Sequence, residues 1–311
     1  MTERVWRGLR VAYVGGDVRE AEMARLSAEA GAEVVTFATP PAEGIPTANS
    51  VEEALAGARV VVGPLPLPEP DGRLYAPASS DPLYLRRQAL EGMATHAHIV
   101  VGRADSELRR VAEETGVALH EYEHDTELMY ERAPAIAEGA IAIAIQRSPV
   151  TIHGTRIGVM GFGRIGRVLV HRLVALGAEV NVLARRPEAR SEARAMGARA
   201  HPIGAAPQVL TALEILFSTV PTRVVTRNLL VALPLGALVV DLAAPPGSVD
   251  HEAGRDLGLE IVWARGLGAS AARTVGRSQW LGVTRILSTV IGPSRARETG
   301  ESAAPKGSNK A

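Results

Sequence analysis

The sequence contains no cysteine, which excludes disulfide bonds, zinc–thiolate sites, iron–sulfur clusters and thiol nucleophiles. Lysine is almost absent as well, because its two copies, Lys306 and Lys310, both lie near the C-terminus. A mechanism in which a lysine in a cleft transfers protons is therefore also excluded. Acid–base chemistry that uses a His–carboxylate pair stays open.

The chain also lacks an excess of charge and a long apolar run. The 34 basic residues balance the 34 acidic ones, which gives no electrostatic case for binding nucleic acid or an anionic membrane. The longest apolar runs, residues 140–145 and 229–242, are too short or too interrupted by Pro234 and Gly236 to span a bilayer. The first ten residues are charged and lack the apolar core of a signal peptide. We therefore expect a soluble, cytoplasmic protein without a membrane partner.

A glycine motif dominates what is present. Residues 155–160 form a short apolar strand pattern that leads directly into G-x-G-x-x-G, and a helical pattern follows. In this setting Gly161 permits the tight turn, Gly163 lets a pyrophosphate approach the backbone, and Gly166 lets the helix pack closely on the sheet. The helix start at Arg164 and Ile165 offers free N–H groups to phosphates. The motif predicts a dinucleotide site; a glycine-rich turn without a ligand is the alternative.

The end of the next strand indicates which dinucleotide is bound. An NAD site usually has Asp or Glu at this point, whereas arginine suits the 2′-phosphate of NADP. Here the strand at residues 179–184 is followed by Arg185 and Arg186, and no acid stands at its tip. A guanidinium matches phosphate geometry with two hydrogen bonds, so we predict NADP.

Two later strands end in loops that should face the nicotinamide side of the cofactor. The first loop contains Thr219, Val220 and Pro221, and the second contains Ala243. We count all four among the cofactor-binding residues, although Thr and Pro are also ordinary turn residues.

Alternation of short apolar strands and amphipathic helices predicts two α/β domains with parallel sheets. We expect an N-terminal Rossmann-like or flavodoxin-like domain at residues 1–125 that carries the substrate site, with a helix at residues 82–90. A connecting helix at 126–150, interrupted by Pro134, leads to an NADP-binding Rossmann domain at 151–291 with a C-terminal helix. The polar residues 292–311 have too little apolar surface to fold and should form a disordered tail.

Two loops could bind a substrate carboxylate. Gly16, Asp17 and Arg19 lie where the first strand meets a helix, although Asp17 could simply cap that helix. Arg273 and Thr274 follow a glycine-rich loop before the last helix, and Arg273 is our preferred carboxylate partner.

The sequence does not identify the catalytic acid or base. His153, just before the dinucleotide strand, is a candidate proton carrier and Arg273 a candidate catalytic residue, but a structural role for His153 is the simpler interpretation. His120 and His124 straddle a strand end and a helix start, so we predict no metal site.

Together these segments resemble the A subunit of dipicolinate synthase over about residues 8–290. The run 151–178 is the most specific part of the resemblance. The matching stretches are Y-V-G-G-D at 13–17 with Arg19, A-E-G-A-I at 137–141, T-I-H-G at 151–154, the glycine motif with A-L-G-A at 175–178, D-L-A at 241–243 with P-G at 246–247, and G-L at 266–267.

The resemblance implies an NADP-dependent oxidation of dihydrodipicolinate, or of its hydrated precursor, to pyridine-2,6-dicarboxylate during sporulation, in the cytoplasm of the mother cell. It implies a small dicarboxylate substrate, a homo-oligomer and, as partner, a flavoprotein-like B subunit. A dicarboxylate calls for two anion sites, one at Gly16, Asp17 and Arg19 and one at Arg273 and Thr274.

The chain departs from this family on the expected substrate side. The departures are E-R-A-P-A-I at 131–136, Ala244-Pro245, and R-G-L-G-A at 265–269. Two alternatives therefore stay open: another two-domain NAD(P)-dependent dehydrogenase of 2-hydroxy or 2-amino acids, and a non-catalytic nucleotide-binding subunit.

Overall fold

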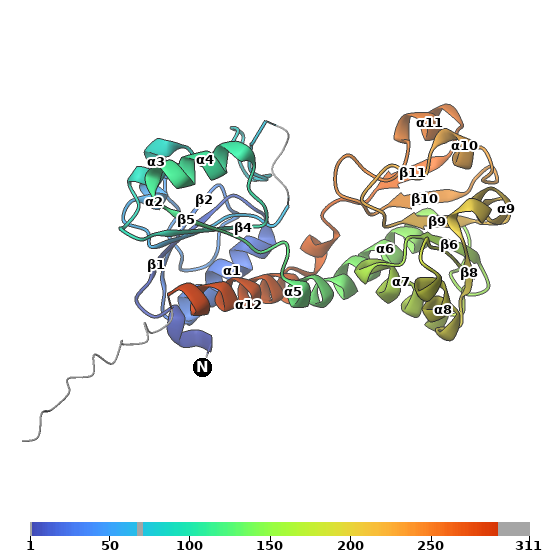
Figure 1. The fold of residues 1–311 in the computed structure, drawn as a ribbon, viewed down its shortest axis with the longest axis horizontal. Helices are drawn as coiled ribbons and strands as arrows, with labels where there is room; N and C mark the ends of the chain where they lie inside the picture. The colour runs from blue at the N-terminus through green and yellow to red at the C-terminus, as the bar shows by residue number, and fades with distance from the viewer. Residues whose placement is uncertain (1, 67–70, 292–311) are drawn as a thin grey trace, which may run out of the picture.

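Two α/β domains, each built on a parallel sheet, make up residues 2–66 and 71–291, which the computed structural model describes (Figure 1). The predicted fold class is confirmed. The predicted disordered tail at 292–311 lies outside the described residues.

The first domain holds a five-stranded sheet in the order β2-β1-β3-β4-β5, which is the flavodoxin-like order. Strands β1 to β4 are rich in Val, because helices cover both faces of a parallel sheet and bury most of their residues, whereas the edge strand β5 has no fully buried residue. The elements are η1 (Thr2–Val5), β1 (Arg10–Val14), α1 (Val18–Glu29), β2 (Glu33–Phe37), α2 (Val51–Leu55), β3 (Val60–Val62), α3 (Arg87–Glu91), β4 (His98–Val101), α4 (Ser106–Thr115) and β5 (Ala118–Glu121).

The helix predicted at residues 82–90 is wrong in its first half. Only α3 (Arg87–Glu91) is helical there. The amide of Leu74 donates to the carbonyl of Leu83 at 2.9 Å, and this pairing with a distant loop takes Leu83 out of any helical ladder. Helical periodicity in the sequence does not reveal such a long-range pairing.

The second domain holds a six-stranded sheet in the order β11-β10-β9-β6-β7-β8, the doubly wound order of dinucleotide-binding domains. The elements are α6 (Ala133–Arg147), β6 (Arg156–Met160), α7 (Arg164–Ala175), β7 (Glu179–Leu183), α8 (Pro187–Ala195), β8 (Arg199–His201), η2 (Ile203–Ala205), α9 (Ala206–Leu210), β9 (Ile215–Ser218), α10 (Arg227–Leu230), β10 (Leu238–Asp241), α11 (His251–Asp256), β11 (Glu260–Trp263) and η3 (Leu267–Ala271).

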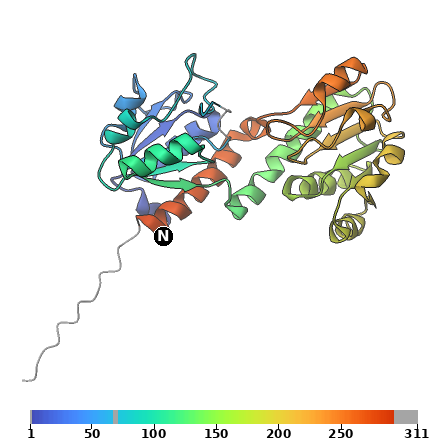
Figure 2. The same cartoon turned by 45° about the horizontal axis from the view of Figure 1, so that its top comes forward.

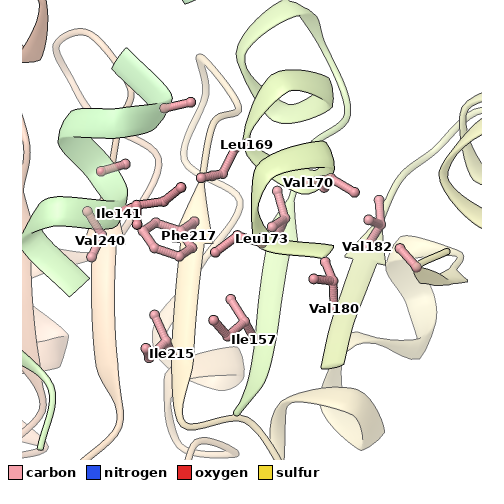
Figure 3. Close-up of a cluster of buried hydrophobic side chains, with 14 of the residues drawn as sticks. Ile141, Ile157, Leu169, Val170, Leu173, Val180, Val182, Ile215, Phe217 and Val240 are labelled. Carbon is pink, nitrogen blue, oxygen red and sulfur yellow. The ribbon is translucent and has the colours of Figure 1, made fainter. Parts of the chain in front are cut away.

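One core of this domain lies between the sheet and helices α6 and α7 (Figure 3). Phe217 of β9 is fully buried there, between Ile141 of α6 and Leu173 of α7. Because α6 contributes to this core, it belongs by its packing to the second domain.

The chain passes between the two domains twice. The first passage joins α5 (Thr126–Glu131) to α6, and Pro134 lies in the first turn of α6, where a missing N–H is tolerated. The second joins η3 to α12 (Ala272–Val290), which returns to the first domain and runs along α1 (Figures 1 and 2). Trp280 of α12 stacks on Trp6 with ring centroids 5.8 Å apart. The final helix, which our sequence boundaries count with the second domain, thus packs on the first.

No helix within residues 2–66 and 71–291 is both long enough and apolar enough to cross a membrane.

Candidate functional site

The carboxyl ends of both sheets border a shared cleft of about 450 Å³. Open parallel sheets bind ligands where neighbouring strands diverge, which is between β1 and β3 in the first sheet and between β6 and β9 in the second. Residues that follow each of these four strands, in the loop or in the first turn of the next helix, line the cleft. From the first domain and α5–α6 come Arg19, Leu65, Pro66, Tyr75, Glu123, Met129, Arg132 and Ile136; from the second come residues 163–165, Thr219, Pro221, 242–245 and 264–268.

The glycine motif has the geometry that a pyrophosphate needs. Gly161 adopts φ +98°, a backbone conformation that favours glycine. A Cβ on Gly166 would lie 2.5 Å from the carbonyl oxygen of Gly161, so only glycine lets α7 approach the strand this closely. At Gly163, in contrast, a Cβ would meet nothing within 4 Å. Gly163 caps α7 without a side-chain hydrogen bond, so the first N–H groups of a 12-residue helix are available to a phosphate.

Arg164 and Ile165, at the start of α7, line the cleft as predicted for cofactor-binding residues. The guanidinium of Arg164 lies over the Tyr130 ring, 5.8 Å from its centroid. The helix start is thus in contact with the segment that leads into the first passage between domains.

Arg185 and Arg186 follow β7 and are both exposed, so their guanidinium groups can reach a ligand at the strand tip. Arg190, which the sequence analysis did not single out, reaches back from α8 and donates to the carbonyl of Ala184 at 2.9 Å and of Arg185 at 2.6 Å. It thereby fixes the backbone that presents the two arginines.

The buried carboxylate of Asp241 fixes the loop after β10 through hydrogen bonds to its backbone. Asp241 is fully buried and accepts hydrogen bonds from the amides of Ala243 at 3.0 Å, Ser248 at 2.9 Å and Val249 at 3.1 Å. Trp263 in turn donates to the carbonyl of Ala243 at 2.9 Å. These bonds fix Ala243 at the edge of the cleft.

The loop after β9 places Thr219 and Pro221 in the cleft, whereas Val220, between them, packs toward Gly161. The hydroxyl of Ser218, at the end of β9, is buried and has no hydrogen-bond partner among the described residues. A polar group is thus available next to the position expected for the cofactor.

Of the three residues predicted to form an anion site, Gly16, Asp17 and Arg19, only Arg19 lines the cleft. Arg19 lines the cleft, but its Nε and Nη2 donate to the two Asp17 carboxylate oxygens, each at 2.8 Å. Burial alone would raise the pKa of Asp17, yet the hydrogen bonds and charge of Arg19 hold that pKa below its usual value. Asp17 also caps α1, as the simpler interpretation had it. Neither Gly16 nor Asp17 is among the residues that line the cleft.

The sequence analysis missed a second guanidinium in the cleft, that of Arg132 at the α5–α6 junction. Its Nε has no hydrogen-bond partner among the described residues, and its Nη1 lies 3.8 Å from Met129 Sδ. Burial, together with the nearby charge of Arg19, lowers the pKa of Arg132 to about 10. This half-buried cation, still protonated at neutral pH, is suited to bind an anion.

Glu123, just after β5, is the second residue that sequence reasoning missed. Its side chain lines the cleft, and Oε2 is buried without a hydrogen-bond partner in the described part of the chain. The only sequence signal for either residue was that Arg132 lies in a stretch that departs from the family pattern.

Three predicted residues lie away from the cleft. His153 precedes β6 and packs against Gly177, which precedes β7, so it lies at the amino ends of the strands, opposite the cleft. Arg273 and Thr274 are exposed on the first turn of α12 and do not line the cleft. The roles predicted for His153 as a proton carrier and for Arg273 as a carboxylate partner therefore find no support in the geometry.

The histidine-rich segment holds no metal-type cluster. His120 pairs with His98, whose Nδ1 lies 3.1 Å from His120 Nε2. The described residues contain no group of three or more His, Asp or Glu side chains arranged to hold a metal ion.

Comparison with known proteins connects both domains to characterised families. Residues 10–123 match the N-terminal domain of the dipicolinate synthase A subunit, and residues 131–239 match the NAD-binding domain of D-isomer-specific 2-hydroxyacid dehydrogenases. The chain is 26% identical to the dipicolinate synthase A subunit of Bacillus subtilis (strain 168) over 297 residues, which cover 94% of this chain and 98% of that protein.

Solved structures agree with this. The dipicolinate synthase A subunit of Bacillus halodurans matches with a TM-score of 0.82 and 26% identity, over 91% of this chain and 99% of that one. Its Bacillus subtilis counterpart matches with a TM-score of 0.78 and 25% identity, over 92% and 98%. A transhydrogenase from Sinorhizobium meliloti, at 17% identity and a TM-score of 0.67, covers 91% of this chain and 94% of its own and shares the fold. The chain belongs to the family of dipicolinate synthase A subunits, and its second domain is an NAD(P)-binding domain.

Proposed function

We propose that this protein is the A subunit of a dipicolinate synthase and oxidises dihydrodipicolinate, or its hydrated precursor, to dipicolinate with NADP⁺ during sporulation. The observation that carries the proposal is the composition of the cleft. One wall is the phosphate-binding end of α7, and the other domain's side of the cleft presents the half-buried guanidinium of Arg132, whose Nε is buried without a partner among the described residues. A dinucleotide and a small carboxylate bound there would be adjacent.

The second domain supplies the groups that would hold NADP. The open backbone at Gly163 and the start of α7 fit the pyrophosphate. Arg185 and Arg186 are exposed just after β7, where this fold would bring a ribose 2′-phosphate, and the loops with Thr219 and Ala243 line the cleft where a nicotinamide would lie. When bound, the nicotinamide supplies an acceptor for a hydride.

The first domain and the first passage supply the groups that would hold the substrate. The guanidinium of Arg132 can form a bidentate pair of hydrogen bonds with one substrate carboxylate. Arg19 uses Nε and Nη2 for Asp17, while its Nη1 lies on the side of Gly268, a residue that lines the cleft. The Arg19 side chain is only 1% exposed, and this third nitrogen is the one left for the second carboxylate.

Aromatisation of the ring provides much of the driving force, so the protein has mainly to orient the dicarboxylate and exclude water. A hydride leaves one ring carbon, and a proton leaves the adjacent carbon. The two walls of the cleft fix the direction in which the ring faces the cofactor.

We further propose that the protein acts in the mother-cell cytoplasm, as a homo-oligomer, together with a flavoprotein-like B subunit. The resemblance to the family is what supports these three statements.

The test is the nicotinamide absorbance during incubation of the purified chain with NADP⁺ and freshly generated aldolase product, with and without a B-type subunit from the same genome. Reduction of NADP⁺ together with formation of dipicolinate supports the proposal and shows whether the partner is needed. NADP binding without reduction in either mixture refutes the reaction and favours a non-catalytic nucleotide-binding subunit. Reduction with a 2-hydroxy or 2-amino acid instead would identify another dehydrogenase.

A further inference from the structure

The oxidation proposed above releases a proton, and the cleft contains few groups that could accept it. Among the described residues that line the cleft, the titratable side chains are those of Arg19, Tyr75, Glu123, Arg132, Arg164 and Arg265. A guanidinium group donates hydrogen bonds only and has no acceptor atom, which excludes the four arginines.

Tyr75 is also unsuited to accept the proton. Burial, together with the nearby Asp17 carboxylate, raises the pKa of the Tyr75 hydroxyl, so it stays protonated. The hydroxyl donates toward Asp17 Oδ2 at 3.4 Å, which directs its proton away from the cleft. Glu123 is therefore the one remaining side chain in the described lining with a basic atom.

The backbone of Glu123 is held firmly in place. Its amide donates to the carbonyl of Gly102 at 3.0 Å, which continues the ladder between β4 and β5 beyond the ends of the strands. The preceding residue, Tyr122, is fully buried, and its hydroxyl donates to the carbonyl of Gly63 at 3.0 Å. A proton acceptor needs such support, because proton transfer depends on a fixed donor–acceptor distance.

One carboxylate oxygen of Glu123 has no hydrogen-bond partner in the described chain. Oε2 is buried and no group in the described chain donates to it, which is an unusual state for a buried acceptor. Arg132 is close enough for electrostatic attraction to Glu123, although no hydrogen bond joins them among the described contacts. Arg132 and Glu123 line the same cleft, so a substrate bound to Arg132 through a carboxylate would have its ring in the part of the cleft that Glu123 lines.

We propose that Glu123 is the catalytic base of the oxidation, an inference that rests on the function proposed above. The Glu123 carboxylate, which lines the cleft, forms an O–H bond with the proton of one ring carbon. The electron pair of that C–H bond becomes a ring π bond as the adjacent carbon releases its hydrogen with both electrons to NADP⁺. NADP⁺ is reduced by two electrons, the ring is oxidised by two electrons, and Glu123 later returns its proton to water.

The test compares Glu123→Ala and Glu123→Gln with Glu131→Gln in the full-length protein, with the B-type subunit if the wild type requires it. Glu131 is a matched control, because its Oε2 is also buried and unpartnered among the described residues but it does not line the cleft. We expect both Glu123 variants to lose kcat by about 10²- to 10⁴-fold. Calorimetric affinities for NADP⁺ and for dipicolinate should stay within about threefold of the wild type, a shift below 1 kcal/mol. Added formate should restore part of the rate to Glu123→Ala, where it fits the vacated space, but not to Glu123→Gln.

A kcat within about threefold of the wild type in Glu123→Ala would overturn the assignment, since a missing base costs far more than that. So would an equal loss in Glu131→Gln, or a loss in Glu123→Ala that formate does not restore, because both would indicate a structural role. If the wild type itself reduces no NADP⁺ with this substrate, with or without the B-type subunit, the reaction is refuted and the base assignment falls with it.

Discussion

Two alanine substitutions in the glycine motif should affect different properties of the protein. Gly166→Ala should lower the stability of the fold, whereas Gly163→Ala should weaken cofactor binding and leave the fold almost as stable. In Gly166→Ala the new Cβ would lie 2.5 Å from the carbonyl oxygen and 3.2 Å from the carbonyl carbon of Gly161. Both atoms are backbone, so a side-chain rotation cannot relieve the clash. Overpacking of this kind costs about 1–3 kcal/mol. At about 2–4 °C per kcal/mol, the melting temperature of this domain should fall by roughly 2–12 °C.

In Gly163→Ala the new Cβ meets no protein atom within 4 Å, and φ of −89° suits any residue. The unliganded protein should therefore lose less than about 1 kcal/mol, the difference between Gly and Ala at a helix N-cap. The methyl group would, however, stand where the pyrophosphate approaches the backbone. Losing one hydrogen bond to a charged group costs about 1.5–3 kcal/mol, so the Kd for NADP should rise about 10- to 100-fold.

Thermal unfolding followed by circular dichroism and fluorescence titration with NADPH measure the two effects separately. Unchanged NADPH affinity in Gly163→Ala would refute the placement of the pyrophosphate. A wild-type melting temperature in Gly166→Ala would refute the close approach of α7 to β6.

Three further predictions concern charged residues. Arg185→Ala combined with Arg186→Ala should weaken NADP binding far more than NAD binding, and equal losses in parallel titrations would remove the basis for preferring NADP. Arg132→Met should lower the calorimetric affinity for dipicolinate at least about tenfold, the value of one charge-assisted hydrogen bond, and leave NADP affinity unchanged; equal affinity in the variant would exclude this guanidinium from the substrate site. Asp17→Asn leaves buried Arg19 without its counter-ion and should cost about 3–5 kcal/mol at neutral pH in urea unfolding. The pKa of Asp17 is lower in the folded state than in the unfolded state, so the stabilising contribution of its carboxylate is fully present above the unfolded pKa of about 3.9 and is lost as the pH falls through the lower folded pKa. The free energies of unfolding of the wild type and of Asp17→Asn should therefore converge in acid. A difference that stays constant with pH would contradict the assignment.

The cofactor side of the site could be predicted from the sequence because its signal is local. A strand, a glycine turn and a helix start occupy a dozen consecutive residues, and each glycine has a steric reason that the structure shows directly, as at Gly161 and Gly166. The same holds for the fold class, because alternation of short apolar strands with helices specifies a parallel sheet.

The substrate side could not be predicted in the same way. Glu123 and Arg132 face the glycine motif only because the chain leaves the first domain at that point and the two sheets present their carboxyl ends to one cleft. Neither Glu123 nor Arg132 belongs to a recognisable sequence motif. His153 shows a different error: it is close to the motif in sequence, yet a residue before a parallel strand lies at the amino edge of the sheet, so strand direction alone could have excluded it.

The return of α12 to the first domain has a consequence for biosynthesis. The buried cluster that contains Trp6, Tyr13 and Met23 is completed by Trp280, Val283 and Leu287, which are synthesised after the whole second domain. The second domain is in effect an insertion within a discontinuous first domain, and its own strands and helices are all synthesised before α12. Folding during synthesis should therefore run against the order of the sequence, with the nucleotide-binding domain complete while the first domain still exposes an apolar face to solvent or to a chaperone.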